Sequence, residues 1–121
     1  MVNALLIASP LIVYVDVDDT LVRSFGSKRI PISGMVQHVR ELHRAGAVLY
    51  CWSSGGAQYA EQSARELGIG DCFTGFLPKP NVAIDDVALS DWPRFVRVHP
   101  NEAASMSSAD YVSALDEPGG R

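Results

Sequence analysis

Apolar residues along the chain gather in short runs, separated by polar stretches. Leu11 to Val15 is a β-branched and aromatic run without alternation, as expected of a strand that is covered on both faces of a sheet. The same criterion predicts strands at 47–52, 82–84 and 95–98. A shorter apolar piece at 72–77 could be a further strand, and the pattern leaves its place in a sheet open.

Between these runs the apolar spacing changes to that of helices. Apolar residues recur every three or four positions from Ser33 to Gly46 and again from Ala57 to Gly68, and both glycines are placed to end a helix. Ser33 is the expected N-cap of the first helix. The tail predicts one weak helix around 109–115, followed by a frayed end.

Strands that alternate with helices predict an α/β domain with a small, mainly parallel sheet, in a three-layer Rossmann-like arrangement. No repeat or long linker divides the sequence, so residues 1–121 are expected to form one domain, with a core at about 11–99 and a tail at about 101–121. A length of 121 residues and a hydrophobic content of 47% are enough for such a domain to bury its own core.

The net charge and the N-terminal segment limit the classes of partner and the location that we expect. A net charge of -4 and a pI near 5.2 argue against nucleic acid or a membrane surface as the main partner. The apolar start, up to Val15, has no basic segment, is interrupted by Pro10 and is too short to cross a bilayer. We interpret it as a buried strand with a lead-in and expect a cytoplasmic protein.

Cys51 and Cys72 are expected to be free, buried thiols.

Residues that can do chemistry follow the apolar runs. They are Asp16-Val17-Asp18-Asp19-Thr20-Leu21, Ser53-Ser54-Gly55-Gly56, Lys79 and Asp85-Asp86. Alone, each group also suits a turn, a helix cap, a solvated loop or a polar strand end. Because the carboxyl ends of parallel strands meet at one edge of a sheet, we expect the groups to lie together.

Such a cluster predicts phosphate chemistry. Carboxylates that lie close together repel one another unless a cation neutralises them. Oxygen ligands without His or Cys favour Mg²⁺, which uses one or two carboxylates with water and substrate phosphate. A lysine and a hydroxyl supply the positive charge and the hydrogen-bond donor that a phosphoryl group requires.

The order of these motifs resembles the haloacid dehalogenase-like superfamily over about residues 11–99. The resemblance implies that Asp16 is a nucleophile that forms an aspartyl-phosphate, and that Asp18 is the general acid and base. A dehalogenase has no leaving oxygen to protonate, so Asp18 favours a phosphohydrolase acting on a phosphomonoester. Asp19 and Thr20 are expected to shape the turn.

The resemblance also implies the ligand-binding residues. Ser53 and Lys79 would hold the phosphoryl oxygens, with Ser54 as the alternative hydroxyl. The expected Mg²⁺ ligands are the Asp16 carboxylate, the Asp18 main-chain carbonyl, Asp86, and Asp85 through water.

Two features depart from that superfamily. Residues 22–32 suffice for a hairpin flap but not for a cap domain, so the site is expected to be open and to take a large or tethered phosphorylated substrate, or to be covered by a second copy of the chain. On the flap, Arg23, Lys28 and Arg29 either contact that substrate or are simply solvated.

The second departure is a short connection. Only residues 78–81 separate the piece at 72–77 from the strand at 82–84, and this segment is too short for a parallel crossover. Either 72–77 is not a full strand or the crossover helix is missing, and we expect at most four strands in the order 5-4-1-2 of the superfamily.

One alternative stays open from sequence. The chain could be a non-catalytic Mg²⁺- and phosphate-binding interaction module of the same fold. A receiver domain has its aspartates and lysine in another order, and a sugar-transferring enzyme with a D-x-D motif requires a longer chain.

Overall fold

The computed structural model describes residues 10–116. The strands are β1 (Ile12–Asp16), β2 (Val22–Phe25), β3 (Lys28–Pro31), β4 (Val48–Ser53) and β5 (Gly75–Pro78). The α-helices are α2 (Ser33–Arg44), α3 (Ala57–Glu66), α4 (Pro100–Ala103) and α5 (Ser108–Asp116), with short 3₁₀ turns at Gly70–Cys72 and Leu89–Asp91. The expected lead-in before residue 10 and the expected frayed end lie outside the described residues.

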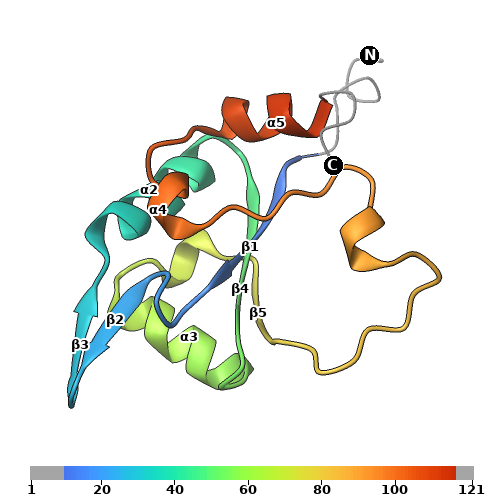
Figure 1. Cartoon of the computed structure of the whole chain (residues 1–121). Helices are drawn as coiled ribbons and strands as arrows, with labels where there is room; N and C mark the ends of the chain where they lie inside the picture. Colours follow the sequence, from blue (N-terminus) through green and yellow to red (C-terminus); the bar gives the residue numbers. More distant parts are fainter. Residues whose placement is uncertain (1–9, 117–121) are drawn as a thin grey trace.

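A three-stranded parallel sheet forms the centre of the fold, in the order β1-β4-β5 (Figure 1). β1 pairs with β4 over its full length, with Asp16 opposite Trp52, and β4 pairs with β5, with Ser53 opposite Pro78. β2 and β3 form a separate antiparallel hairpin. The predicted α/β class, the mainly parallel sheet and the hairpin at 22–32 are therefore confirmed, in a Rossmann-like arrangement flanked by helices.

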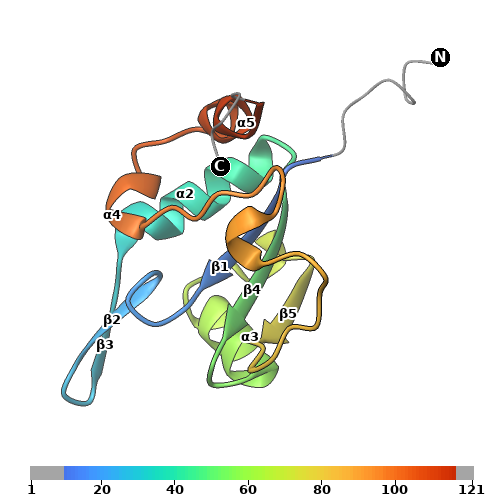
Figure 2. The ribbon, with the colours of Figure 1, turned by 45° about the vertical axis from the view of Figure 1, so that its right-hand side comes forward.

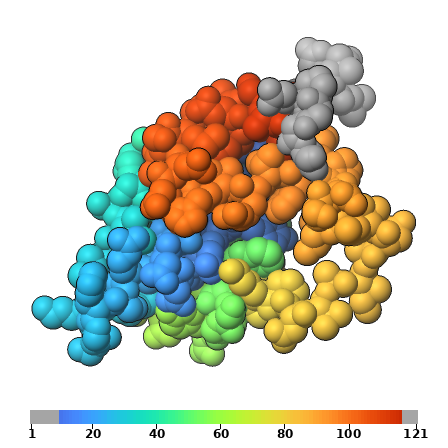
Figure 3. Space-filling model, viewed as in Figure 1, coloured from blue at the N-terminus to red at the C-terminus, as the bar shows by residue number. Residues whose placement is uncertain are grey.

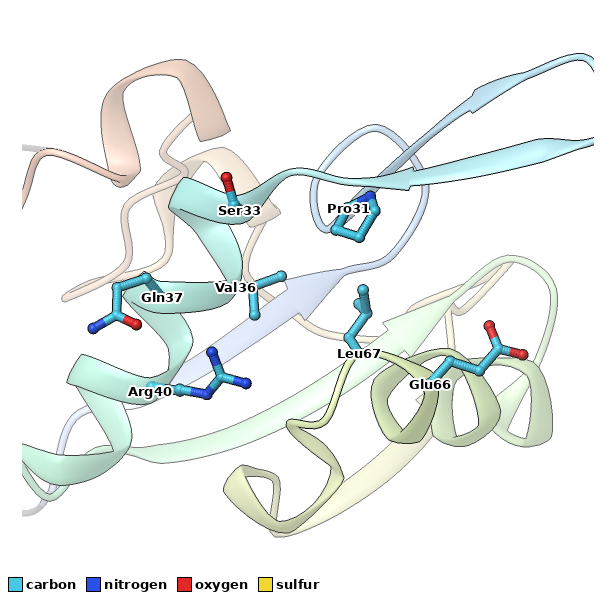
Figure 4. A pocket seen from close by; sticks show the side chains of 7 residues that line it. All are labelled: Pro31, Ser33, Val36, Gln37, Arg40, Glu66 and Leu67. Carbon is cyan, nitrogen blue, oxygen red and sulfur yellow. The ribbon is translucent and has the colours of Figure 1, made fainter.

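The two crossover helices lie on the same side of the sheet. Both connections step across the sheet in one direction, from β1 to β4 and from β4 to β5, and a parallel crossover is right-handed. Figure 4 looks from that side, with α2 and α3 in front of the strands. Leu49, Cys51 and Ser53 of β4 face the helices and are almost fully buried.

The other face of the sheet is only partly covered. Tyr14, Tyr50 and Trp52 lie on it, and the ring of Tyr14 contacts both of the others, edge-on to that of Trp52 at 4.9 Å between centroids. Tyr14 keeps 46% of its surface exposed and Ile12 60%. The expectation that the first strand is covered on both faces was therefore wrong.

The two later strands that we expected from the sequence do not form. Residues 82–84 belong to an irregular loop that runs away from the sheet (Figure 1), with Val82 and Ile84 76% and 97% exposed. Residues 95–98 are likewise irregular. The open question about 72–77 is answered by β5, which pairs with β4 and is followed by no crossover helix. The predicted order 5-4-1-2, in the numbering of the superfamily, was wrong. The runs at 82–84 and 95–98, which would supply strands 4 and 5 of that numbering, form no strands, and β5 from the piece at 72–77 extends the sheet beyond β4 instead.

The C-terminal segment packs back onto α2 (Figure 2). The hydroxyl of Tyr111 on α5 lies 2.7 Å from Nε2 of the buried His38 on α2. α5 confirms the helix expected around 109–115, whereas α4 was not predicted. Ile32, not Ser33, is the N-cap of α2, and it makes no side-chain capping bond. Among the described residues, no helix is long and apolar enough to cross a membrane.

Candidate functional site

A tight loop at the end of β1 positions Asp16 and Asp18, two of the three aspartates of the first motif. Val17 and Leu21 are fully buried and anchor the loop in the core. The carbonyl of Val17 accepts hydrogen bonds of 2.8–3.2 Å from three amides that follow it. Asp19 has a φ of 62°, in the left-handed region where aspartate is among the few tolerated residues. The loop thereby leaves Asp16 half-buried at the strand end and Asp18 exposed beside it.

Lys79 lies next to the first aspartate. Its Nζ is 3.5 Å from Oδ2 of Asp16, and both side chains are about one-third exposed, at 36% and 32%. The main-chain N–H of Lys79 donates to the carbonyl of Ser53 at 2.9 Å, so the end of β5 fixes its position against β4. Its ammonium also lies 5.8 Å from the centroid of the Trp52 ring.

Asp16 also affects the thiol behind it. Burial, with a smaller contribution from the Asp16 charge, raises the pKa of Cys51 to about 12. Cys51 is fully buried and therefore remains a protonated, inert thiol at neutral pH. Both cysteines are free thiols as predicted, but Cys72 is only half-buried, so the expectation that it is buried was wrong.

The two serines at the end of β4 differ in access. Ser53 is only 1% exposed, and its Oγ accepts a hydrogen bond from the amide of Gly55 at 3.0 Å. Ser54 is exposed. In this geometry Ser54 is the hydroxyl that solvent, and hence a ligand, can reach.

Tyr59 is a site residue that the sequence did not single out. Its hydroxyl donates to Oδ1 of Asp18 at 2.7 Å, and this hydrogen bond is the main reason that the pKa of Tyr59 is raised. The ring reaches Asp18 by packing against Gly55, where an added Cβ would lie 2.9 Å from Cδ2 of Tyr59. Gly55 ahead of α3 was the available signal, because it leaves room for the ring.

Asp85 and Asp86 are not gathered into this group. Both are exposed on the loop that leaves β5, and Oδ1 of Asp85 accepts a hydrogen bond from the amide of Val87 at 2.9 Å. Within residues 10–116, no group of three or more His, Cys, Asp or Glu side chains is arranged to hold a metal ion. The structure therefore brings Asp16, Asp18 and Lys79 to one edge without the second acidic pair.

The three flap cations have different surroundings. Arg23 and Lys28 are exposed on the β2–β3 hairpin. Arg29 instead turns toward α3, where its Nη1 forms an ion pair with Oε1 of Glu66 at 2.7 Å. Of the expected substrate contacts on the flap, Arg29 is thus the one whose guanidinium is held by α3.

The site itself is an open edge and not a deep pocket. Figure 3 shows the blue atoms of β1 and its loop beside the green end of β4 and the yellow end of β5. A hollow of about 430 Å³ lies elsewhere, between the hairpin, α2 and α3, and is lined by Pro31, Ser33, Val36, Gln37, Arg40, Glu66 and Leu67 (Figure 4). This hollow includes none of the strand-end residues, so it does not define the candidate site.

A comparison with protein families finds a match over the part of the chain that forms this edge. A family model described as a protein of unknown function (DUF705) matches residues 2–83. The chain belongs to the DUF705 family. The DUF705 match includes β1, β4 and β5, and thus Asp16, Asp18 and Lys79, whereas Asp85 and Asp86 lie beyond it. No curated protein and no solved structure matches the chain.

Proposed function

We propose that this DUF705 chain is a Mg²⁺-dependent phosphohydrolase of the haloacid dehalogenase-like type, which cleaves a phosphomonoester through an aspartyl-phosphate. One observation carries the proposal: the Asp16 carboxylate and the Lys79 ammonium lie 3.5 Å apart at the carboxyl edge of a parallel sheet, with Asp18 two residues further on. A carboxylate beside a fixed cation can attack phosphorus while the cation offsets the charge of the phosphoryl oxygens.

The proposed reaction has two steps. In the first, an Asp16 carboxylate oxygen bonds to phosphorus, the ester P–O bond breaks, and Asp18 gives its proton to the leaving oxygen. In the second, Asp18 takes a proton from water, the hydroxide attacks phosphorus, and the Asp16–phosphorus bond breaks to release inorganic phosphate. Lys79 and the exposed Ser54 would hold the phosphoryl oxygens throughout, with Ser53 as the alternative, because Ser53 is 1% exposed although its hydroxyl can still donate while Oγ accepts from Gly55.

The oxygen atoms at this edge fit Mg²⁺. The Asp16 carboxylate and the Asp18 main-chain carbonyl would hold the ion, and water and substrate phosphate complete the set that Mg²⁺ usually takes. The bound ion would neutralise charge on the phosphoryl group. Asp85 and Asp86 remain proposed further ligands, which requires the exposed loop that bears them to move toward β1.

An open site implies a substrate that binds mainly through other contacts. Within the described residues, the β2–β3 hairpin is the only flap near the loop of Asp16, and it is too small to enclose a metabolite. We therefore expect a large or tethered phosphorylated molecule that touches Arg23 and Lys28, or closure of the site by a second copy of the chain.

Hydrolysis of p-nitrophenyl phosphate by the full chain tests the proposal. We expect phosphate release that is abolished by EDTA, restored by Mg²⁺ and absent in Asp16→Asn. Acid quenching followed by mass spectrometry should find a phosphoryl group on Asp16. Asp71→Asn is the matched control, because Asp71 is a fully exposed aspartate outside the site. Activity that persists in Asp16→Asn, or without a divalent cation, would rule the assignment out, and Asp86→Asn shows whether the loop takes part.

A binding module is the second candidate. Such a module requires only the edge formed by Asp16 and Lys79, and the second acidic pair, Asp85 and Asp86, lies on an exposed loop outside that edge. A module of this kind would bind Mg²⁺ and inorganic phosphate in calorimetry, lose phosphate binding in Lys79→Met and release no phosphate from any ester. The phosphohydrolase predicts turnover as well as binding.

A further inference from the structure

A chain of contacts runs from the β2–β3 hairpin to Asp18. Nη2 of Arg29 donates to the hydroxyl oxygen of Tyr59 at 3.1 Å and to Oγ of Ser63 at 2.9 Å, while Nη1 pairs with Glu66 at 2.7 Å. The guanidinium also lies 5.3 Å from the centroid of the Tyr59 ring. The Tyr59 hydroxyl in turn donates to Oδ1 of Asp18 at 2.7 Å. The hydrogen bonds therefore all point the same way: the arginine donates to the phenol, and the phenol donates to the carboxylate.

These contacts depend on one stripe of α3. Tyr59, Ser63 and Glu66 are spaced by four and three residues, so they lie on the same helical face, and that face receives the hairpin. Ser63 is 1% exposed, which places one end of the Arg29 fork in a dry position. A planar fork that bonds three partners is fixed more firmly than a lysine could be.

Asp18 has few other restraints. Its side chain is exposed, and its neighbour Asp19 is held only by the local turn. An exposed aspartate normally samples several rotamers, and each lost rotamer costs conformational entropy. The 2.7 Å bond from Tyr59 selects one of them before any ligand arrives.

We propose that Tyr59 is a positioning residue for Asp18 and that Arg29 holds Tyr59 in place, so that docking of the hairpin on α3 sets the competence of the site. This inference rests on the proposed function in assigning proton transfer to Asp18. Arg29 then acts through geometry and not by attracting an anionic substrate. The raised pKa of Tyr59 is consistent with this role, because the phenol keeps its proton and remains a donor at neutral pH.

Leaving-group dependence tests the catalytic half of the inference. Phenyl phosphate needs its leaving oxygen protonated, whereas p-nitrophenolate leaves with little help. Tyr59→Phe and Arg29→Gln should each lower kcat for phenyl phosphate about tenfold or more, lower kcat for p-nitrophenyl phosphate only about twofold, and leave both KM values nearly unchanged. Tyr111→Phe and Arg65→Gln are the matched controls, since they remove a tyrosine hydroxyl and a helix-surface ion pair away from the edge.

Arg29→Lys separates geometry from charge. Lysine keeps the positive charge but cannot bond Tyr59, Ser63 and Glu66 together, so it should behave like Arg29→Gln. Full rescue by lysine, or an equal loss of kcat for both substrates, would overturn the inference.

Two measurements do not depend on turnover. Amide hydrogen exchange across residues 22–31 should be faster in both Arg29 variants and unchanged in Arg65→Gln. Side-chain couplings measured by NMR should show one χ1 rotamer of Asp18 in the parent and averaging in Tyr59→Phe. If the parent hydrolyses neither ester, the proposed function fails while these data still decide the inference. Averaged couplings in the parent, or unchanged exchange in the Arg29 variants, would refute it.

Discussion

Replacing Gly55 by alanine is expected to disturb the site through a single close contact. The added Cβ would lie 2.9 Å from Cδ2 and 3.1 Å from Cγ of Tyr59. These atoms are at the base of the ring, so relief requires rotation of the side chain, which carries the hydroxyl at its far end away from Asp18. Overpacking of this kind costs about 1–3 kcal/mol. For a chain of this size the cost should lower Tm by roughly 3–12 °C.

Urea unfolding of the full chain, followed by circular dichroism, measures this cost, and phosphate release measures the effect on Asp18. Gly34→Ala is the matched control, because its Cβ would meet Ala104 at an ordinary 3.5 Å and alanine favours the helix by up to about 1 kcal/mol. In a Tyr59→Ala background the Gly55→Ala cost should nearly disappear. An unchanged stability of Gly55→Ala, or the same cost with and without the Tyr59 ring, would refute the reasoning.

Substitutions at three further positions have defined outcomes. Lys79→Met should reduce phosphate release by about 100-fold or more. It should change the free energy of unfolding by less than about 1 kcal/mol, because the side chains of Lys79 and Asp16 are both about one-third exposed to solvent. A large loss of stability would contradict this. Asp19→Gly should be as stable as the parent or more so, and Asp19→Val less stable by about 1–2 kcal/mol, since φ is 62°; equal melting of the two would count against the turn geometry. Burial lowers the pKa of His38 below 6.5, partly opposed by Glu41, so its contribution to stability is complete above pH 6.5 and is lost as pH falls through the lowered value. Tm should therefore drop more steeply from pH 7.5 to 5 in the parent than in His38→Gln, and equal slopes would contradict it.

The sequence predicted the elements that depend on local pattern. The run at 11–15 and the spacing after Ser33 and Ala57 correctly indicated β1, α2 and α3. The same pattern could not show that one face of β1 stays partly open, because that depends on both crossovers stepping in the same direction. Coverage of a strand is a property of topology and not of its own residues.

The later strands failed for a related reason. Val82 to Ile84 has strand-forming residues, but β propensity mainly expresses packing on a half-buried pleated surface, and here no such surface is offered. The Pro78-Lys79-Pro80 segment is also too short to form a parallel crossover from β5 to a strand at 82–84.

The strand-end motifs were predictable because the rule for parallel sheets places them together, and Asp16 and Lys79 follow it. Tyr59 was not predictable in this way. Its contacts with Asp18 and Arg29 span 41 and 30 residues, and they depend on how the hairpin lies against α3. No short-range pattern encodes that docking angle.

The contact between Lys79 and Trp52 has an optical consequence. The chain contains two tryptophans, and the Lys79 ammonium lies 5.8 Å from the ring of only one of them, Trp52. Indole emission responds to the electric field across the ring, so an anion that draws the ammonium away from the indole shifts the fluorescence. With Trp92 replaced by phenylalanine, Trp52 is the single tryptophan left, and its emission reports occupancy at the strand ends. The molecule carries its own spectroscopic probe, with no label attached.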